Sequence, residues 1–343
     1  MATATRGNGV EGATGDGSVI TSHQFHARAH ALSGHLHHPV YQRINEQALV
    51  TIHDERGGHI LERENNFTLE GVVSFESAHS RVAGNRSLKT NGWVTLSTSI
   101  VEGLNVLEVI TADRMVSQVS TEHPQNDGHV PHVTFLGSQF VHLRLSGFEI
   151  TPKFNFGICG PKPPGTTPYV RHVGFLENTK AQLKVVVGKL QEHLKAIARS
   201  PDNEDQALLP RDQPLLNLLN KALNEYIGKL KDVEQRITNA KDYENGNHEE
   251  NGKTELVTCS LIDTIDIDHI PIPGLRTAGH LLFIPEFGTV ALGQIAVSST
   301  LIPDDYVNYD NHFELKMIDM DLGCIGDGEV SAATAAANGH TKP

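Results

Sequence analysis

The stretch HVTFLGSQFVHLRLSGFEI, residues 132–150, contains two runs in which apolar and polar residues alternate. Val133 and Phe135 carry the alternation in the first run, and Val141, Leu143 and Leu145 carry it in the second. Successive side chains of a strand point to opposite faces of a sheet, so this period of two is typical of strands with one buried face. The stretch therefore predicts two half-buried strands of an antiparallel sheet.

Similar patterns recur on both sides of this stretch. In residues 24–31, phenylalanine and alanine alternate with histidine and arginine. Further strands are predicted at 49–54, 67–77, 92–101, 105–120, 256–268, 279–284, 289–298 and 313–322. Between two of them, Glu286-Phe287-Gly288 has the composition of a tight hairpin turn.

Residues 177–253 break the strand pattern, because their apolar residues recur at steps of three and four, the spacing of a helix with one apolar face. A first helix is predicted at 176–199. A second is predicted to begin after Asp212, a candidate N-cap, with Pro214 in its first turn, and to end near Tyr243. Two such helices form an antiparallel hairpin that either packs within its own domain or pairs with a second copy.

The sequence thus predicts a mainly β fold, an antiparallel sandwich- or barrel-like domain interrupted by a long helical hairpin insertion. The expected division is a flexible tail at 1–21, the N-terminal part of the β domain at 22–172, the hairpin with its polar return loop at 173–254, the C-terminal part of the β domain at 255–328, and a flexible tail at 329–343. Both tails are rich in small and polar residues without periodicity.

The composition, with 38% apolar and 20% charged residues, is that of a folded globular protein. A formal net charge of −13 argues against a nucleic-acid-binding surface. No apolar run approaches the roughly 20 residues of a membrane span. No secretory leader pattern is present, which favours a cytoplasmic protein. The 20 histidines are expected to become mostly charged by the isoelectric point of 5.8, so that solubility and self-association, with a homo-oligomer as the expected assembly, depend on pH.

Two clusters of residues are candidates for metal ligands. Six histidines lie within residues 23–38, and of these His35, His37 and His38 are the candidates for a zinc, copper or nickel site. A solvated, structural role and a pH-responsive interface are the alternatives for this cluster. Acidic pairs two residues apart, with Asp266 and Asp268 as candidate ligands, have the oxygen chemistry of a calcium site.

A second acidic pair, Asp319 and Asp321, would have to lie close to the first pair to complete the ligands of such a calcium site. The alternative is a structural role, in which these carboxylates form charged outer faces that protect exposed strands against aggregation. The three cysteines, Cys159, Cys259 and Cys324, are too far apart for a zinc ribbon. They are expected to be buried thiols, with one disulfide plus a free thiol as the alternative.

No Gly-x-Ser-x-Gly elbow, phosphate-binding loop, dinucleotide fingerprint or His-Glu-x-x-His motif occurs in the chain. The leading functional hypothesis is therefore a non-enzymatic structural or interaction protein without a cofactor, self-associating through β edges or the helical hairpin. A divalent-metal-binding protein that uses the histidine cluster is the second hypothesis, and a hydrolase of unrecognised type is the third.

Four strings, taken in order, resemble the strand signatures of the choice-of-anchor P family of bacterial proteins. They are VLEVITADRMVSQVS (106–120), HVTFLGSQFVHLRLSGFEITP (132–152), IPEFGTVALGQIAVS (284–298) and NHFELKMIDMDLG (311–323). The resemblance covers about half of the chain and leaves out the helical hairpin. It implies a β-rich protein that is exported or associated with the cell surface, in contrast to the cytoplasmic placement favoured by the missing leader pattern, and it carries over no functional residue.

Overall fold

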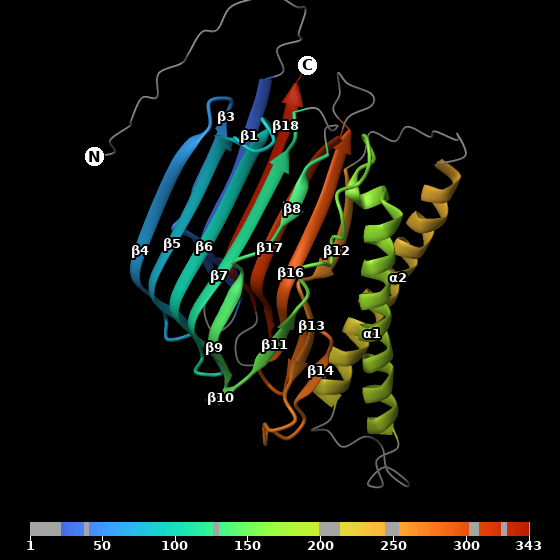
Figure 1. The fold of residues 1–343 in the computed structure, drawn as a ribbon. Coiled ribbons are helices and arrows are strands. Elements are labelled where there is room, and N and C mark those ends of the chain that lie inside the picture. Colours follow the sequence, from blue (N-terminus) through green and yellow to red (C-terminus); the bar gives the residue numbers. More distant parts are fainter. Residues whose placement is uncertain are drawn as a thin grey trace, which may run out of the picture.

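The computed structural model describes residues 22–37, 41–125, 130–198, 213–243, 254–301, 309–323 and 328–342 (Figure 1). The expected N-terminal tail therefore lies outside the described residues. The strands of the first half are β1 (Ser22–Leu36), β2 (Gln42–Gln47), β3 (Val50–Asp54), β4 (Gly58–Leu69), β5 (Val73–Arg86), β6 (Trp93–Val106), β7 (Ile110–His123), β8 (His132–Thr134), β9 (Gln139–Leu145), β10 (Phe148–Glu149) and β11 (Thr151–Phe154). A 3-10 turn, η1 (Tyr169–Arg171), precedes the helices α1 (Val173–Ala198) and α2 (Gln213–Tyr243). The remaining strands are β12 (Glu255–Ser260), β13 (Ile262–Asp266), β14 (Arg276–Ala278), β15 (Leu281–Ile284), β16 (Gly288–Leu301), β17 (Tyr309–Leu322) and β18 (Gly328–Lys342).

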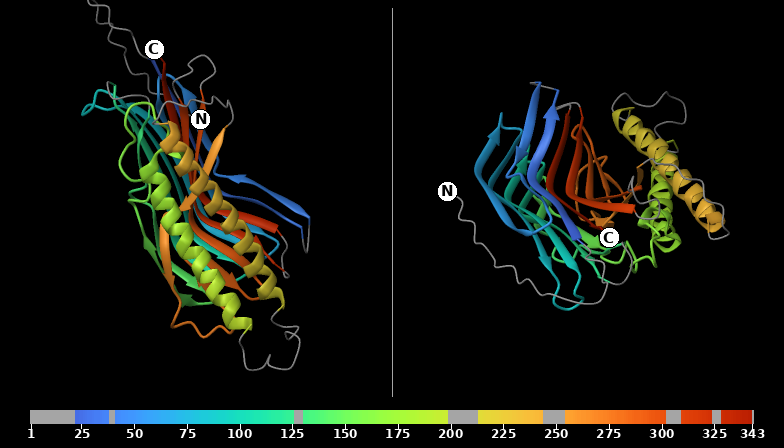
Figure 2. Two further views of the ribbon diagram at one scale, coloured as in Figure 1. Left: turned by 90° about the vertical axis from the view of Figure 1, so that its right-hand side faces the viewer. Right: turned by 90° about the horizontal axis from the view of Figure 1, so that it is seen from above.

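These strands form two antiparallel sheets that pack face to face, together with a small ribbon of β11 and β13. Sheet A has the order β14-β15-β16-β17-β18-β1-β2, with β12 paired to β16 and β3 paired to β1. Sheet B has the order β10-β9-β7-β6-β5-β4, with β8 paired to β7. The helices lie on the side of sheet A that faces away from sheet B (Figure 2). The predicted fold class, a mainly β antiparallel domain with a helical hairpin inserted between β11 and β12, is confirmed.

Small side chains bring the two sheets close together at the end where β1 starts. Alanines of β1 and β18 face serines and threonines of β6 and β7, all of them buried. Ser97 and Ser99 of β6 donate hydrogen bonds to the carbonyl oxygens of Arg28 and His30, at 2.7 and 2.9 Å. Ser117 of β7 donates to the carbonyl of Leu315 at 3.0 Å. Hydroxyl groups thus bond directly to the backbone of the facing sheet, which a core of large side chains would prevent.

The C-terminal segment differs most from the sequence-based expectation. Residues predicted to form a flexible tail, 329–343, instead supply most of β18, which pairs with β17 on one side and with β1 on the other. The segment has no large apolar residue beyond Val330 and therefore no visible alternation. Its alanines are suited to the close approach of the two sheets, because a larger side chain would not fit there.

One transverse row in each sheet interrupts the alternation of side chains. The row is marked by residues with left-handed backbone on alternate strands: Asn66, Gly103 and His142 in sheet B, and Gly293 and Ala333 in sheet A. The pairing register continues across the row, but the parity of the buried positions changes there, for example from odd to even numbers in β5 and from even to odd numbers in β7. In β5, Glu76 and Ser77 therefore both point away from the core.

Three predicted strands each cover parts of two observed strands. The segment 256–268 covers β12, which pairs with β16, and β13, which pairs with β11. The segment 67–77 spans a turn, in which the Val72 amide donates to the Leu69 carbonyl at 2.8 Å, and 105–120 spans a second turn at Leu107 and Glu108. The hairpin turn at Glu286-Phe287-Gly288 is confirmed, because Ile284 pairs with Gly288 and Glu286 has a positive φ of 63°.

Helix α1 is anchored by its apolar stripe, which is buried together with residues of sheet A. Its buried residues include Phe175, Leu176, Leu183, Val186 and Leu190. They belong to the same hydrophobic cluster as the inner residues of both sheets. The hairpin is thus packed within its own domain, and pairing with a second copy stays a prediction. Neither described helix has both the length and the apolar character that a bilayer span requires.

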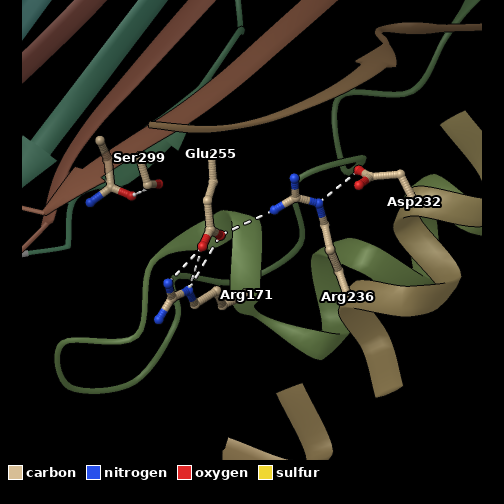
Figure 3. A network of polar contacts seen from close by, with 6 residues as sticks. Arg171, Asp232, Arg236, Glu255 and Ser299 are labelled. Atoms are coloured by element: carbon tan, nitrogen blue, oxygen red, sulfur yellow. Dashed lines mark hydrogen bonds and ion pairs between the residues drawn. The ribbon is translucent and has the colours of Figure 1, made fainter. Parts of the chain in front are cut away.

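An ion-pair network ties the base of the hairpin to sheet A (Figure 3). Glu255 at the start of β12 accepts hydrogen bonds from Arg171 of η1, at 2.6 and 3.1 Å, and from Arg236 of α2, at 3.1 Å. Arg236 also donates to Asp232 at 2.7 Å. Arg171, Arg236 and Glu255 are each about one-fifth exposed, so the network is partly shielded from water. It holds the two ends of the insertion together.

Candidate functional site

The outer face of sheet A carries a row of polar side chains on neighbouring strands. Asp321 of β17 is paired with Glu329 of β18, and Glu329 is paired with His35 of β1. Residues directly opposite in an antiparallel ladder point to the same face, with Cβ atoms about 5 Å apart. Strand β18 therefore brings one member of the histidine cluster and one member of the second acidic pair onto a common surface, with Glu329 between them.

Helix α2 crosses this surface and forms one wall of a cleft of about 360 Å³. The floor consists of residues of β16, β17 and β18. Four carboxylates and two ammonium groups line the cleft: Glu225, Asp319, Asp321, Glu329, Lys221 and Lys316. The formal charge of the cleft is therefore negative.

The Lys221 ammonium of α2 lies among carboxylates of the cleft. It donates to Asp321 at 2.5 Å, and Glu225 and Glu329 add a favourable field. The hydrogen bond to Asp321 is the main cause of a raised pKa of Lys221. The arrangement shows that the cleft stabilises a primary ammonium group.

Asp319 is held by a second set of partners within the same cleft. The Ser331 hydroxyl donates to it, and Lys316 lies 3.6 Å away. The carboxylate of Asp319 is thus held by a hydroxyl group on one side and an ammonium group on the other.

A buried hydrogen bond fixes α2 beside the cleft. The Tyr226 hydroxyl and Nε2 of His280 are 2.9 Å apart, and the Lys229 ammonium lies 4.5 Å from the centre of the tyrosine ring. Burial lowers the pKa of His280 to about 3 and raises the pKa of Tyr226 above its ordinary value. Both groups are therefore neutral at physiological pH and serve to position the helix.

The predicted metal ligands are brought together only in part. The rings of His35 and His37 are in contact, with centroids 4.7 Å apart, and His38 lies outside the described residues. Asp266 and Asp268 are both exposed, and Asp266 accepts a hydrogen bond from the backbone amide of Asp268 at 3.1 Å, which closes a turn at the end of β13. In the part of the chain that the structure describes, no group of three or more His, Cys, Asp or Glu side chains is arranged to hold a metal ion.

Burial also changes the expected titration of the histidines. The pKa of His30 is lowered to about 4, mainly because the ring is buried. Burial likewise lowers the pKa values of His79, His172 and His312. The expectation that most histidines become charged by pH 5.8 is thus wrong for His30 and His280, and the pKa values of the other three are shifted in the same direction.

The cysteines are consistent with the expectation of buried thiols as far as they are described. Cys159 and Cys259 are free and buried, and Cys324 lies outside the described residues. Burial raises the pKa of Cys259 to about 12 and that of Cys159 well above its ordinary value. Neither thiol is therefore a reactive nucleophile.

Residues 23–298 match the family model described as "Domain of unknown function (DUF8256)". The chain belongs to this family. The match runs from β1 into β16, so His35 and Glu225 lie within it, whereas Asp319, Asp321 and Glu329 follow it. No curated protein and no solved structure matches the chain. The resemblance to the choice-of-anchor P family stays a prediction from the sequence.

Proposed function

We propose that this member of the DUF8256 family is a non-enzymatic interaction protein whose cleft between α2 and sheet A binds a cationic segment of a partner protein. The observation that carries the proposal is the position of Lys221. Its ammonium occupies the cleft beside Asp321, with Glu225 and Glu329 close enough to affect its pKa. A lysine or arginine side chain of a partner would meet the same carboxylates.

The charge of the cleft supports a cationic partner. Glu329 is exposed and is only one strand away from Asp321. The two lysines of the cleft do not neutralise its four carboxylates. The formal net charge of −13 on the whole chain adds a long-range attraction for cations.

The proposal is tested with a fluorescein-labelled octalysine peptide, whose binding is followed by fluorescence anisotropy at low and at physiological salt. Glu329→Gln is expected to weaken binding about threefold, the usual effect of one exposed charge pair. Lys221→Gln is expected to tighten binding by a similar factor, because it releases Asp321 for the ligand.

The matched control is Glu64→Gln on the exposed edge strand β4, which removes the same charge from the opposite sheet. It should change the affinity much less than Glu329→Gln. Equal effects of the two variants would show that the peptide responds only to net charge, and the proposed cleft would be wrong.

A further inference from the structure

The outer face of sheet B contains a second recess, unrelated to the cleft beside α2. It has a volume of about 400 Å³ and spans β4, β5, β6 and β7. Its lining includes Asn66, Thr68, Glu76, Asn105, Thr111 and Asp113. Within the described ranges, no helix or strand packs over this face (Figures 1 and 2). We propose that this recess is a binding site for a neutral glycan.

The recess follows from the transverse row described above. Gly103 lies in the middle of the row, with Glu76 on the strand to one side and Asp113 on the strand to the other. A Cβ atom on Gly103 would lie only 2.5 Å from Cγ of Glu76. The glutamate stem therefore occupies the space above the glycine, so that the Glu76 side chain leans over β6, the strand that lies between it and Asp113.

Asp113 is held in place by two neighbours on β9. Arg144 donates to one of its oxygens at 2.7 Å, and Nδ1 of His142 lies 2.6 Å from the other. The hydrogen bond from Arg144, followed by that from His142, lowers the pKa of Asp113. The carboxylate is thus ionised and oriented before any ligand arrives, which reduces the cost of ordering it on binding.

Asn105 is oriented in a similar way. Its side-chain oxygen accepts a hydrogen bond from the backbone amide of Glu108 at 2.8 Å. Because one end of the amide group is fixed, its direction in the recess is fixed as well. Thr68 and Thr111 add hydroxyl groups, which both donate and accept.

This set of groups fits a chain of sugar hydroxyls better than other polymers. A carboxylate accepts hydrogen bonds from two neighbouring hydroxyls at once, and amides and threonines complete the pattern. Nucleic acids and acidic glycans are disfavoured because the lining includes two carboxylates and neither lysine nor arginine, the nearby Arg144 being paired with Asp113. A protein partner is disfavoured because the recess does not offer the apolar pocket in which anchor side chains of protein interfaces usually bind.

The test is isothermal titration of the full chain with four neutral hexasaccharides: cellohexaose, xylohexaose, mannohexaose and N-acetylchitohexaose. At least one is expected to bind with a Kd on the order of 1 mM, because hydrogen bonds without an aromatic platform give weak binding. Oligogalacturonate of the same length should bind at least tenfold more weakly than that sugar. The proposal is overturned if none of the four sugars binds at a concentration 10-fold above the expected Kd. It is also overturned if oligogalacturonate binds as tightly as the neutral sugar.

Variants locate the site. Glu76→Gln and Asp113→Asn are each expected to weaken sugar binding about tenfold, as expected for the loss of a charge-assisted hydrogen bond. Glu62→Gln, on the exposed edge strand β4 and outside the recess, is the matched control and should leave the affinity unchanged. Equal effects of Glu76→Gln and Glu62→Gln would refute the assignment. Glu329→Gln separates this site from the cleft, since it should affect octalysine and not the sugar.

Discussion

Acidification should destabilise this fold through His280, the imidazole that positions α2. The ring is almost completely buried, and its pKa falls from an ordinary 6.5 to about 3 in the folded chain. Between these two values the unfolded state binds a proton that the folded state excludes. The free energy of unfolding therefore rises with pH across this window. The part of it that depends on the neutral His280 ring is lost progressively as the pH falls below 6.5.

The magnitude follows from the two pKa values. At pH 7.5 the ring is neutral in both states and costs nothing, whereas at pH 5.0 protonation of the unfolded state alone lowers the free energy of unfolding by about 2 kcal/mol. The result hardly changes if the folded pKa is 4 instead of 3, because the folded ring is neutral at pH 5.0 in either case. His30, with a folded pKa of about 4, adds a loss of similar size.

Urea unfolding at pH 7.5 and 5.0, followed by far-UV circular dichroism, measures this loss. His280→Gln keeps an acceptor for the Tyr226 hydroxyl but removes the titrating ring, so its stability should fall by about 2 kcal/mol less than that of the parent chain between the two pH values. His59→Gln, on the exposed strand β4, is the matched control and should behave like the parent. An identical pH dependence in all three proteins would refute the reasoning.

Three further predictions concern the backbone and the ion pairs. Gly103→Ala should lower the free energy of unfolding, measured by thermal unfolding, by about 2 kcal/mol, because φ is +66° and the new methyl group meets Glu76. Gly188→Ala in α1, where nothing lies within 4 Å of the new methyl group, should raise it by about 0.5 kcal/mol. Glu255→Gln should lower the free energy of unfolding by about 2 kcal/mol and increase amide hydrogen exchange in α2, because it leaves Arg171 and Arg236 without the carboxylate between them. Unchanged exchange would contradict the role given to the network. Removal of residues 328–342 should abolish cooperative unfolding, and a truncated chain with a normal transition would show that β18 is dispensable.

The helices and most of the long strands were predictable because the spacing of their apolar residues indicates which face is buried. The helical stripes of 177–253 and the alternation in β1, β9 and β16 place apolar residues on one side. The observed helices and strands differ from the predicted ones at their ends. The turns inside 67–77 and 105–120 were missed because apolar residues continue through them, so the pattern shows no break.

The candidate site was predictable only in fragments. His35 and the pair Asp319 and Asp321 were recognised as chemically suitable, but nothing in the pattern indicated that they lie on one face. The strand that joins them, β18, is rich in alanine and resembles a flexible tail in the sequence. Glu329 was missed for the same reason, because a residue in an expected tail has no assigned face.

The recess on sheet B was not predictable from alternation at all. It depends on left-handed residues at matching positions of separate strands, and a single sequence does not reveal which strands are neighbours. Gly103 and Asn66 are individually unremarkable. Their contribution to the recess is recognised only from the strand register, which places them in one row with Glu76 and Asp113.

The central position of β18 also has a consequence for biosynthesis. Ala29 pairs with Ala335, about 300 residues later in the chain. At roughly 5–20 residues per second, β1 leaves the ribosome tens of seconds before its partner strand exists. During that interval one edge of β1 has unpaired backbone groups that favour mispairing with other nascent chains. A ribosome that stalls after β16 therefore releases a chain whose first sheet cannot close, and we expect such products to be bound by chaperones or to aggregate.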